Sequence, residues 1–220
     1  LMHICWIYGC TWDSKFNASK SQAISFGGTH PCFALKLGND VIQWVNRVKY
    51  LGCYFTCSGT VDTSLALGKF YGLLNNILNV VGRNRNEMLT VHLAATYCLP
   101  TLLYSCENWS LRAHELQPLS VAWNNSFRKI FNCCWRESPR CLMFFCKQLP
   151  VSFLIDQRRL VFWKQMIHGD NSLLHLLAKL CLPAMLAVAT KYGISQSLCN
   201  ISYREIKQSI WTAFLNTVNY

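Results

Sequence analysis

Phosphate chemistry in proteins depends on carboxylates that lie close together, and the acidic residues of this sequence are few and widely spaced. Two metal ions that carry the charge of a phosphoryl transfer need hard oxygen ligands from neighbouring Asp or Glu side chains. The ten acidic residues are Asp13, Asp40, Asp62, Glu87, Glu107, Glu115, Glu137, Asp156, Asp170 and Glu205. No two of them have the spacing that would place both on one metal pair, and no Asp-Asp pair occurs. The sequence therefore predicts no catalytic metal pair.

The other reactive residue types give no second candidate. Among 13 cysteines the only adjacent pair is Cys133-Cys134, and no C-x-x-C motif occurs. Cys53 and Cys57 lack the downstream partner pair that a structural zinc site needs. His114 and Glu115 are neighbours on a predicted helix, so their side chains point apart. We expect no metal site, and reduced, mostly buried thiols in an intracellular protein.

The net charge is the most informative feature of the composition. The chain has 220 residues with 21 Lys and Arg against 10 Asp and Glu, a formal net charge of +11. Hydrophobic residues make up 52% and charged residues 14%, which excludes a disordered tail. A basic surface favours a polyanion, either nucleic acid or an anionic membrane. A basic soluble protein without such a partner is the alternative.

The first 60 residues predict a small β region. Residues 1–16 have the pattern of the end of a helix with its connection. Short apolar runs separated by Gly, Asn and Asp then predict strands joined by tight turns. These runs cover residues 23–26, 33–37, 41–45 and 48–55.

From Asp62 the apolar residues follow a helical period. One helix face is predicted from steps of three and four residues, through Leu67, Phe70, Leu74, Ile77 and Val81. On that helix, Gly68 and Gly72 are one turn apart, which indicates either a close helix crossing or simple tolerance of glycine. Asn86 is a candidate N-cap of the next helix, and Pro100 should kink or restart it.

The rest of the chain is predicted to be helical. A third helix has its apolar stripe at Leu116, Leu119, Trp123, Phe127, Ile130 and Cys134. A short helix over 141–149 follows, and then a longer one from Pro150 to about His168. Residues 173–220 are predicted helical with an interruption near Gly193. Pro183 interrupts the strongly apolar residues 173–189, which we interpret as a buried helix pair and not a membrane span.

These patterns predict an α+β fold that is mainly α. A small antiparallel β region should precede an all-helical region. We expect boundaries that give residues 1–60, 61–135 and 136–220.

Two motifs in the β region resemble reverse transcriptases of non-LTR (LINE-type) retrotransposons. Residues 16–21 (FNASKS), followed by the strand around residues 24–27 (ISFG), resemble the "N-x-x-K-[ST]" turn and edge strand after the catalytic turn of that family. Residues 48–52 (VKYLG) resemble the "KYLG" signature of the primer-grip hairpin. The two motifs in this order, about thirty residues apart, are more specific than either alone.

The helical region continues the resemblance to about residue 171. Residues 99–104 (LPTLLY) with Glu107 and Trp109 are similar to the family's "LPTLLYGxExW" segment. Residues 128–131 (RKIF) and 135–136 (WR) resemble its basic helix. Residues 158–160 (RRL) with 162–163 (FW) resemble the helix beyond it. Within the first of these segments, Ser105 stands where the family usually has Gly, and Cys106 where it has a small residue.

The resemblance implies supporting roles for the β region. Lys20 matches a lysine that faces the leaving pyrophosphate, with a solvated turn lysine as the alternative. Tyr50, Leu51 and Gly52 match the primer grip, an end-of-palm hairpin. There Gly52 would let the backbone approach the sugar-phosphate and Leu51 would anchor the hairpin in the core.

The resemblance also implies a thumb-like helical region that contacts a nucleic-acid duplex along its length. The basic residues that would neutralise phosphates are Arg128, Lys129, Arg136, Arg158 and Arg159. Trp135 and Trp163 are candidate stacking rings, and each is equally a candidate core residue.

The family's catalytic aspartates lie upstream of the matched segments, and this chain has no "[FY]-x-D-D" turn. We therefore expect an incomplete RNA-directed DNA polymerase that positions an RNA/DNA primer-template duplex in the nucleus or cytoplasm. Mg²⁺ would belong to the complete enzyme, and no cofactor and no membrane partner are expected for this chain. Two alternatives remain, a non-enzymatic helical protein-interaction module and a decayed retroelement relic.

Overall fold

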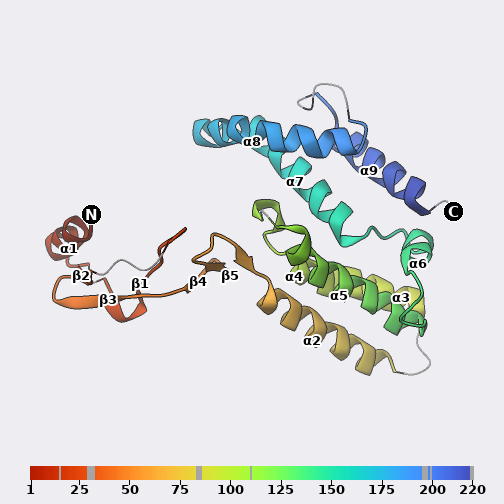
Figure 1. The fold of residues 1–220 in the computed structure, drawn as a ribbon, viewed down its shortest axis with the longest axis horizontal. Coiled ribbons are helices and arrows are strands. Elements are labelled where there is room, and N and C mark those ends of the chain that lie inside the picture. Colours follow the sequence, from red (N-terminus) through yellow and green to blue (C-terminus); the bar gives the residue numbers. More distant parts are fainter. Residues whose placement is uncertain are drawn as a thin grey trace. The chain divides into compact units, whose positions relative to one another are not determined.

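The computed structural model describes residues 1–14, 16–28, 33–82, 86–109, 111–194, 198 and 200–218. The chain divides into two units, Leu1–Thr63 and Ser64–Tyr220 (Figure 1). About 63% of the chain is helical and about 10% is strand, and the strands belong to the first unit. The prediction of an α+β fold that is mainly α is confirmed.

The first sheet of the first unit follows helix α1 (Met2–Thr11) and the short 3₁₀ helix η1 (Ala18–Lys20). Its strands are β1 (Gln22–Ala23), β2 (Leu35–Leu37) and β3 (Asp40–Trp44). β3 is central, and it pairs antiparallel with β2 and parallel with β1. The sequence did not predict this parallel pair. The run at residues 23–26 forms a strand only at its start, and Leu37 and Ile42 supply the buried apolar side chains.

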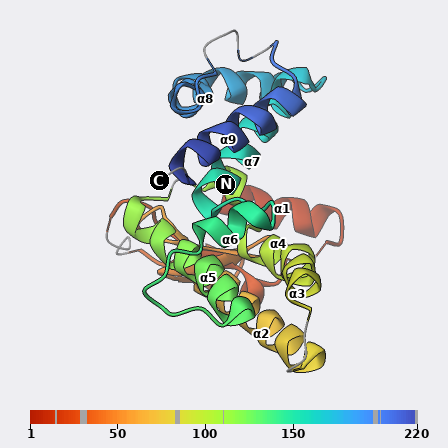
Figure 2. The ribbon, with the colours of Figure 1, turned by 90° about the vertical axis from the view of Figure 1, so that its right-hand side faces the viewer.

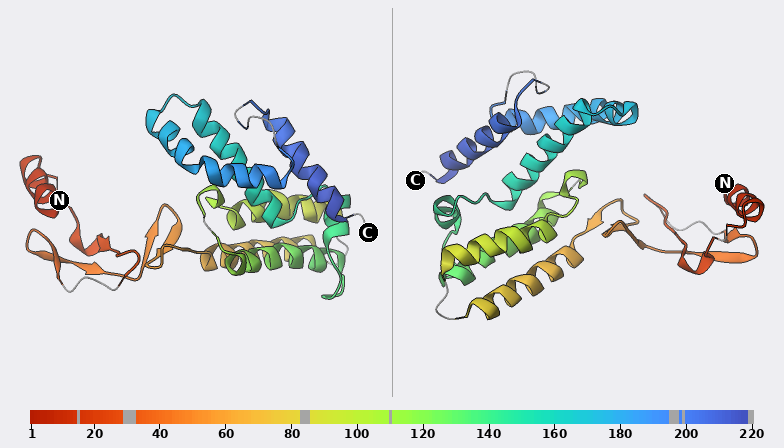
Figure 3. Two further views of the ribbon diagram at one scale, coloured as in Figure 1. Left: turned by 45° about the horizontal axis from the view of Figure 1, so that its top comes forward. Right: turned by 180° about the vertical axis from the view of Figure 1, so that it is seen from behind.

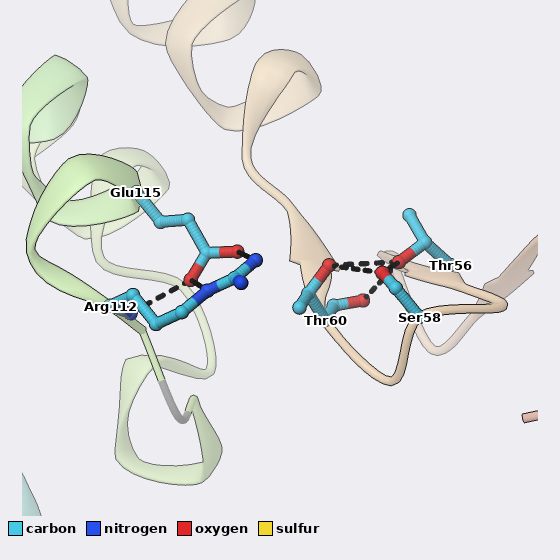
Figure 4. Close-up of polar contacts among 5 residues, drawn as sticks. All are labelled: Thr56, Ser58, Thr60, Arg112 and Glu115. Atoms are coloured by element: carbon cyan, nitrogen blue, oxygen red, sulfur yellow. Dashed lines mark hydrogen bonds and ion pairs between the residues drawn. The ribbon is translucent and has the colours of Figure 1, made fainter. Parts of the chain in front are cut away.

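The second sheet is an antiparallel meander of β4 (Arg47–Tyr50), β5 (Cys53–Thr56) and β6 (Val61–Asp62). The predicted single run over residues 48–55 is thus two strands, because the chain turns at Leu51 and Gly52. The β5–β6 turn is closed by hydroxyl groups (Figure 4). Thr56 Oγ1 lies 2.8 Å from both Ser58 Oγ and Thr60 Oγ1, which fixes this turn.

The first half of the second unit is a helical bundle. Its elements are α2 (Ser64–Val81), α3 (Glu87–Leu93), the π-helical turn η2 (Ala94–Cys98), α4 (Leu99–Leu102), the 3₁₀ turn η3 (Cys106–Asn108) and α5 (Ala113–Phe131). Helix α2 packs against both α4 and α5, as Figure 3 shows from two sides. Phe70 on α2 and Trp123 on α5 are fully buried, and their rings meet edge to face.

Helix α3 begins at its predicted cap. Asn86 caps α3, and its Oδ1 accepts the Leu89 N–H at 3.1 Å, as predicted. Pro100 has no N–H to donate, and its ring clashes with the turn that precedes it. The π-helical turn η2 lies in this preceding segment. The close crossing at Gly68 and Gly72 is wrong, because a Cβ at either position would meet no atom within 4 Å.

Helix α5 buries most of its predicted stripe but ends earlier than predicted. Leu119, Trp123, Phe127 and Ile130 are buried. The helix stops at Asn132, which adopts a left-handed conformation with φ of 53°. Cys134 therefore lies beyond the helix and is exposed, so its inclusion in the stripe is wrong. At the other end, Glu115 accepts the backbone N–H of Arg112 at 2.7 Å and its Nη2 at 3.0 Å (Figure 4).

The second half of the unit contains α6 (Arg140–Phe145), α7 (Val151–His168), α8 (Ser172–Lys191) and α9 (Tyr203–Val218). Helix α7 packs against α8 and α9 (Figure 2). Helix α6 is shorter than the predicted 141–149, because Lys147 is left-handed with φ of 53°. Residues 195–197, 199 and 219–220 of the predicted helical tail lie outside the described residues.

The predicted buried helix pair over residues 173–189 is wrong. Residues 172–191 form one helix, α8, which continues through Pro183. Most of α8 is exposed, and only Ala178, Met185 and Ala189 are buried. Among the described helices, α8 is the one that is long and apolar enough to cross a membrane by length and composition alone.

Candidate nucleic-acid interface

The Lys20 turn is closed by the polar residues of its own motif. Asn17 Oδ1 accepts the Lys20 backbone N–H at 3.2 Å and the Ser19 hydroxyl at 2.6 Å. From the other side of the turn, Ser21 Oγ donates to the Asn17 carbonyl at 2.9 Å. Asn and Ser side chains close turns in this way because they reach nearby backbone groups. The turn therefore presents Lys20, which is exposed, at the end of η1.

A hollow of about 700 Å³ lies beside this turn. Its polar lining comes from the turn residues Asn17, Ser19 and Ser21, from Gln22 of β1, and from Asp40 and Gln43 of β3. These groups offer hydrogen bonds but a single carboxylate. Over the described ranges of the chain, no three His, Cys, Asp or Glu side chains gather to hold a metal ion. The residues present do not fit a magnesium pair.

The β4–β5 hairpin presents its tip to solvent. Leu51 and Gly52 have φ values of 45° and 84°, the pattern of a type I′ turn. The predicted anchoring of Leu51 in the core is wrong, because Leu51 is 74% exposed. Tyr50 is also exposed, and its cross-strand partner Cys53 is the buried residue at this end of the hairpin. A left-handed conformation is costly for leucine, so this tip is strained.

One side of strand β4 is basic, which the sequence motifs did not indicate. Arg47 and Lys49 are two residues apart on β4 and therefore share one face. Arg47 pairs with Asp62 at 3.0 Å, and its Cζ lies 3.8 Å from the centre of the Tyr54 ring. The alternation of Arg47, Val48, Lys49 and Tyr50 was the available signal for this face.

At the end of α5 the structure brings Arg128 to the loop that contains Arg136. Arg128 donates to the Glu137 carbonyl from Nε at 3.1 Å and from Nη2 at 3.0 Å. Its Nη1 donates to Asn125 Oδ1 at 2.9 Å. Arg128 thus ties this loop to α5, and Lys129 beside it is exposed. Arg136 is exposed and its Cζ lies 5.1 Å from the ring of Trp135, which is 75% exposed.

On α7 the predicted basic pair lies partly inside the unit. Arg158 Nη1 donates to the Leu103 carbonyl at 3.1 Å and lies 3.8 Å from Glu107 Oε1. Arg159 is half-buried, and its Nε has no hydrogen-bond partner within the described part of the chain. Trp163 is buried, and its Nε1 donates to the Ala178 carbonyl at 2.8 Å. A stacking role for Trp163 is therefore wrong.

The candidate residues lie on several different elements. Lys20 belongs to η1, whereas Tyr50, Leu51 and Gly52 belong to the hairpin of the second sheet. Arg128, Lys129 and Arg136 gather at the end of α5, and residues 158–159 lie on α7.

The cysteines are free thiols in the part of the chain that the structure describes, with Cys32 and Cys199 outside it. Burial raises the pKa of Cys98 to about 11. Burial, with a further contribution from Glu107, raises the pKa of Cys106 to about 12. A thiol with such a pKa stays protonated near neutral pH, so neither is a nucleophile there.

The geometry describes a basic, mainly helical α+β protein with an exposed hairpin tip and two groups of basic side chains. Comparison of the chain with protein-family models, with curated proteins and with solved structures gives no match.

Proposed function

We propose that this chain binds an RNA/DNA primer-template duplex as a non-catalytic part of a reverse transcriptase of the non-LTR retrotransposon type. The proposal rests on the resemblance of its motifs to that family and on one structural observation, the tip of the β4–β5 hairpin. Such a duplex forms inside cells, so the proposal places the chain in the nucleus or cytoplasm.

The hairpin tip supports binding because it is both strained and exposed. Leu51 adopts a φ of 45° that leucine rarely takes, and its side chain is 74% exposed. Asn or Gly at this position would relieve the strain, and solvent exposure gives leucine no folding advantage. The turn requires a left-handed residue here but does not require leucine, and a strained residue that folding does not require is a sign of a functional position. In the proposal, Tyr50 and Leu51 contact the sugar-phosphate chain where Gly52 permits close approach.

Basic side chains support the proposal through charge. Lys49 on the hairpin and Lys129 and Arg136 at the end of α5 are exposed. Contacts of this kind neutralise phosphates without reading bases, so binding should be insensitive to sequence and strongly dependent on salt. Trp135 beside Arg136 offers an exposed ring on which an unpaired base can stack.

Nucleotide addition is not part of the proposed function. Magnesium ions in that reaction need close carboxylates, and the chain's ten acidic residues do not provide such a pair. The polar hollow beside Lys20 has one carboxylate, from Asp40. The chain's proposed part is to hold the duplex.

Fluorescence anisotropy with a labelled RNA/DNA duplex, measured over a series of salt concentrations, tests the proposal. We expect binding that weakens linearly with log salt concentration, and no primer extension in a parallel assay with Mg²⁺ and deoxynucleotides. Binding that is absent or insensitive to salt would contradict the duplex-holding role. Primer extension by the purified chain would contradict the absence of catalysis.

A further inference from the structure

Helix α8 leaves several of its large apolar residues exposed. Its buried positions are Ala178, Met185 and Ala189. The opposite side forms a leucine ridge of Leu173, Leu176, Leu177 and Leu180, which are 61%, 54%, 42% and 69% exposed. A helix that only needs to pack on its own protein places its largest apolar residues toward the core. Contiguous exposed apolar residues of this kind mark an interaction surface.

The direction of this ridge is fixed by contacts between α8 and α7. Near the start of the helix, Trp163 Nε1 donates to the Ala178 carbonyl at 2.8 Å. Near its end, Asp156 Oδ2 accepts from Lys191 Nζ at 2.7 Å and from the Tyr192 hydroxyl at 2.6 Å. These bonds hold the buried side of α8 on α7, so the leucine ridge cannot turn inward without breaking them.

The formal charge on α8 itself is positive, and the exposed Asp170 precedes the helix. Helix α8 contains Lys179 and Lys191 and no acidic residue. Lys191 is paired with Asp156, whereas Lys179 is exposed on the flank of the ridge. The chain as a whole carries +11. A partner that binds this face must therefore bury apolar side chains, and it must tolerate or prefer positive charge nearby.

A small apolar hollow opens on the same flank. It has a volume of about 250 Å³ and lies between α7 and α8, with Trp163, Ile167 and Leu182 among its lining residues. Lys179 also lines it. An apolar hollow with an amine at its side matches the chemistry of an acyl chain that ends in an anionic headgroup.

We propose that the leucine ridge of α8 docks on the surface of an anionic lipid bilayer, with the helix lying in the interface plane. Leucine side chains would enter the acyl boundary while Lys179 meets the headgroups, as in other interfacial helices. Because hydrogen bonds hold the other side of α8 on α7, the proposal places the helix along the bilayer surface and not across it. A second copy of the chain would bring two strongly basic proteins together, and nucleic acid would leave the leucines uncovered.

Vesicle co-sedimentation of the full chain tests this proposal. The probes are vesicles of phosphatidylcholine alone and of phosphatidylcholine mixed equally with phosphatidylserine. The test variant combines Leu173→Gln, Leu176→Gln and Leu180→Gln. The matched control combines Val80→Gln on α2, Leu89→Gln on α3 and Val121→Gln on α5, because these three residues are also exposed. Circular dichroism checks that each variant keeps its helix content.

We expect the unaltered chain and the control to bind the anionic vesicles, and to bind the neutral ones at least about tenfold more weakly. The leucine variant should lose at least about tenfold of the anionic binding, since burial of each leucine contributes substantially. Equal binding by the leucine variant and the control would overturn the proposal, as would no vesicle binding by the unaltered chain. Duplex binding should be unchanged in the leucine variant, so this test is separate from the proposed duplex role.

Sedimentation velocity without lipid tests the alternative that a second copy of the chain covers the leucine ridge. If the unaltered chain dimerises and the leucine variant does not, while neither binds vesicles, a second copy covers the ridge and the bilayer proposal fails. If the unaltered chain stays monomeric at the concentrations used for vesicle binding, the bilayer proposal is supported against self-association.

Discussion

Arg158 Nη1 donates a hydrogen bond to the backbone carbonyl of Leu103 over 3.1 Å, and the same atom lies 3.8 Å from Glu107 Oε1. This arginine on α7 therefore joins the segment that follows α4, although 55 residues separate it from Leu103. Leu103 and Glu107 belong to one motif quoted for the family resemblance, and Arg158 belongs to another. Their occurrence in one sequence has a direct structural reason, because one motif supplies the donor and the other supplies the acceptors.

Replacing Arg158 should lower stability more than it lowers duplex affinity. Arg158→Ala leaves the Leu103 carbonyl and Glu107 without this donor, and we expect a loss of about 1–2 kcal/mol in the free energy of unfolding. This loss lies at the low end of the range for hydrogen bonds from a charged donor, because the Arg158 side chain is 36% exposed. Arg158→Lys should recover part of the loss, since it keeps the charge near Glu107. Urea denaturation followed by circular dichroism measures both.

Arg136→Ala is the matched control for this change. Arg136 is exposed on a loop, so its removal should change stability by less than about 0.5 kcal/mol. Equal effects of the two substitutions on unfolding would show that the bond to Leu103 does not stabilise the fold.

Ser105→Gly should stabilise the chain. Ser105 has a φ of 61°, a left-handed conformation that glycine adopts without strain. This geometry explains why glycine suits the position in the family that the segment resembles. We expect a gain of about 0.5–1 kcal/mol, reduced slightly by loss of the bond from Asn108 Nδ2 to Ser105 Oγ. Thermal unfolding of Ser105→Gly beside Ser105→Ala measures it, because alanine removes the hydroxyl and keeps the strain. A gain in the alanine variant as large as that in the glycine variant contradicts the explanation.

The sequence was most informative where a local rule decides the structure. The period of α2 and α5, the cap at Asn86 and the end of α7 near His168 depend on neighbouring residues alone. The predictions failed where contacts between residues far apart in the sequence decide the structure. Nothing local shows that Trp163 is buried and bonds to the Ala178 carbonyl, or that α8 continues through Pro183.

The candidate site shows the same division. Turn chemistry at Asn17 and Ser21 is readable from the motif, because both side chains act within four residues. The orientation of Leu51 was predicted incorrectly, because a two-residue turn moved this leucine from a strand to an exposed tip. Arg128 and Arg158 are basic residues whose guanidinium groups bond to backbone carbonyls of the protein. Sequence alone gives their charge and not this use of it.

Lys129 and Arg136 should account for part of the salt dependence of duplex binding. The double variant Lys129→Ala with Arg136→Ala removes two positive charges from one end of α5. We expect the slope of log affinity against log salt to fall by about 1 for each phosphate that the variant no longer neutralises. Lys69→Ala with Lys207→Ala, on α2 and α9, removes the same charge elsewhere and is the control. If both double variants lower affinity and slope equally, net charge and not the α5 group governs binding.

Leu51→Asn should separate stability from binding at the hairpin tip. Asparagine followed by Gly52 is a preferred type I′ turn, so relief of strain should stabilise the hairpin by about 1 kcal/mol. Hydrogen exchange at the amides of β4 and β5 reports this gain. In the duplex-binding proposal the same variant should bind more weakly, because the exposed leucine side chain is gone. Leu51→Ala keeps the backbone strain, so it should lose binding without gaining stability. Unchanged affinity in both variants would remove Leu51 from the interface.

Cys98 and Cys106 should make the fold sensitive to alkaline pH. Both thiols are fully buried, and burial raises the pKa of Cys98 to about 11 and that of Cys106 to about 12, from an ordinary value of 9.0. In the unfolded chain both ionise near pH 9, whereas in the folded chain they stay protonated. The folded state is therefore undisturbed below pH 9 and loses stability as pH rises toward the folded pKa values. The slope is at most about 1.4 kcal/mol per pH unit for each thiol.

Urea denaturation at a series of pH values from 8 upward measures this loss, with each protein compared with its own stability at pH 8 because substitution of a buried residue shifts the whole curve. Cys98→Ala with Cys106→Ala should show a shallower decline than the unaltered chain. Cys134→Ala with Cys141→Ala removes two exposed thiols and should leave the decline unchanged. An aromatic disulfide reagent at pH 8 should label the exposed thiols of the folded chain and reach Cys98 and Cys106 only after unfolding. Rapid labelling of either buried thiol in the folded chain, or an unaltered pH slope in its alanine variant, would show that burial does not hold these protons.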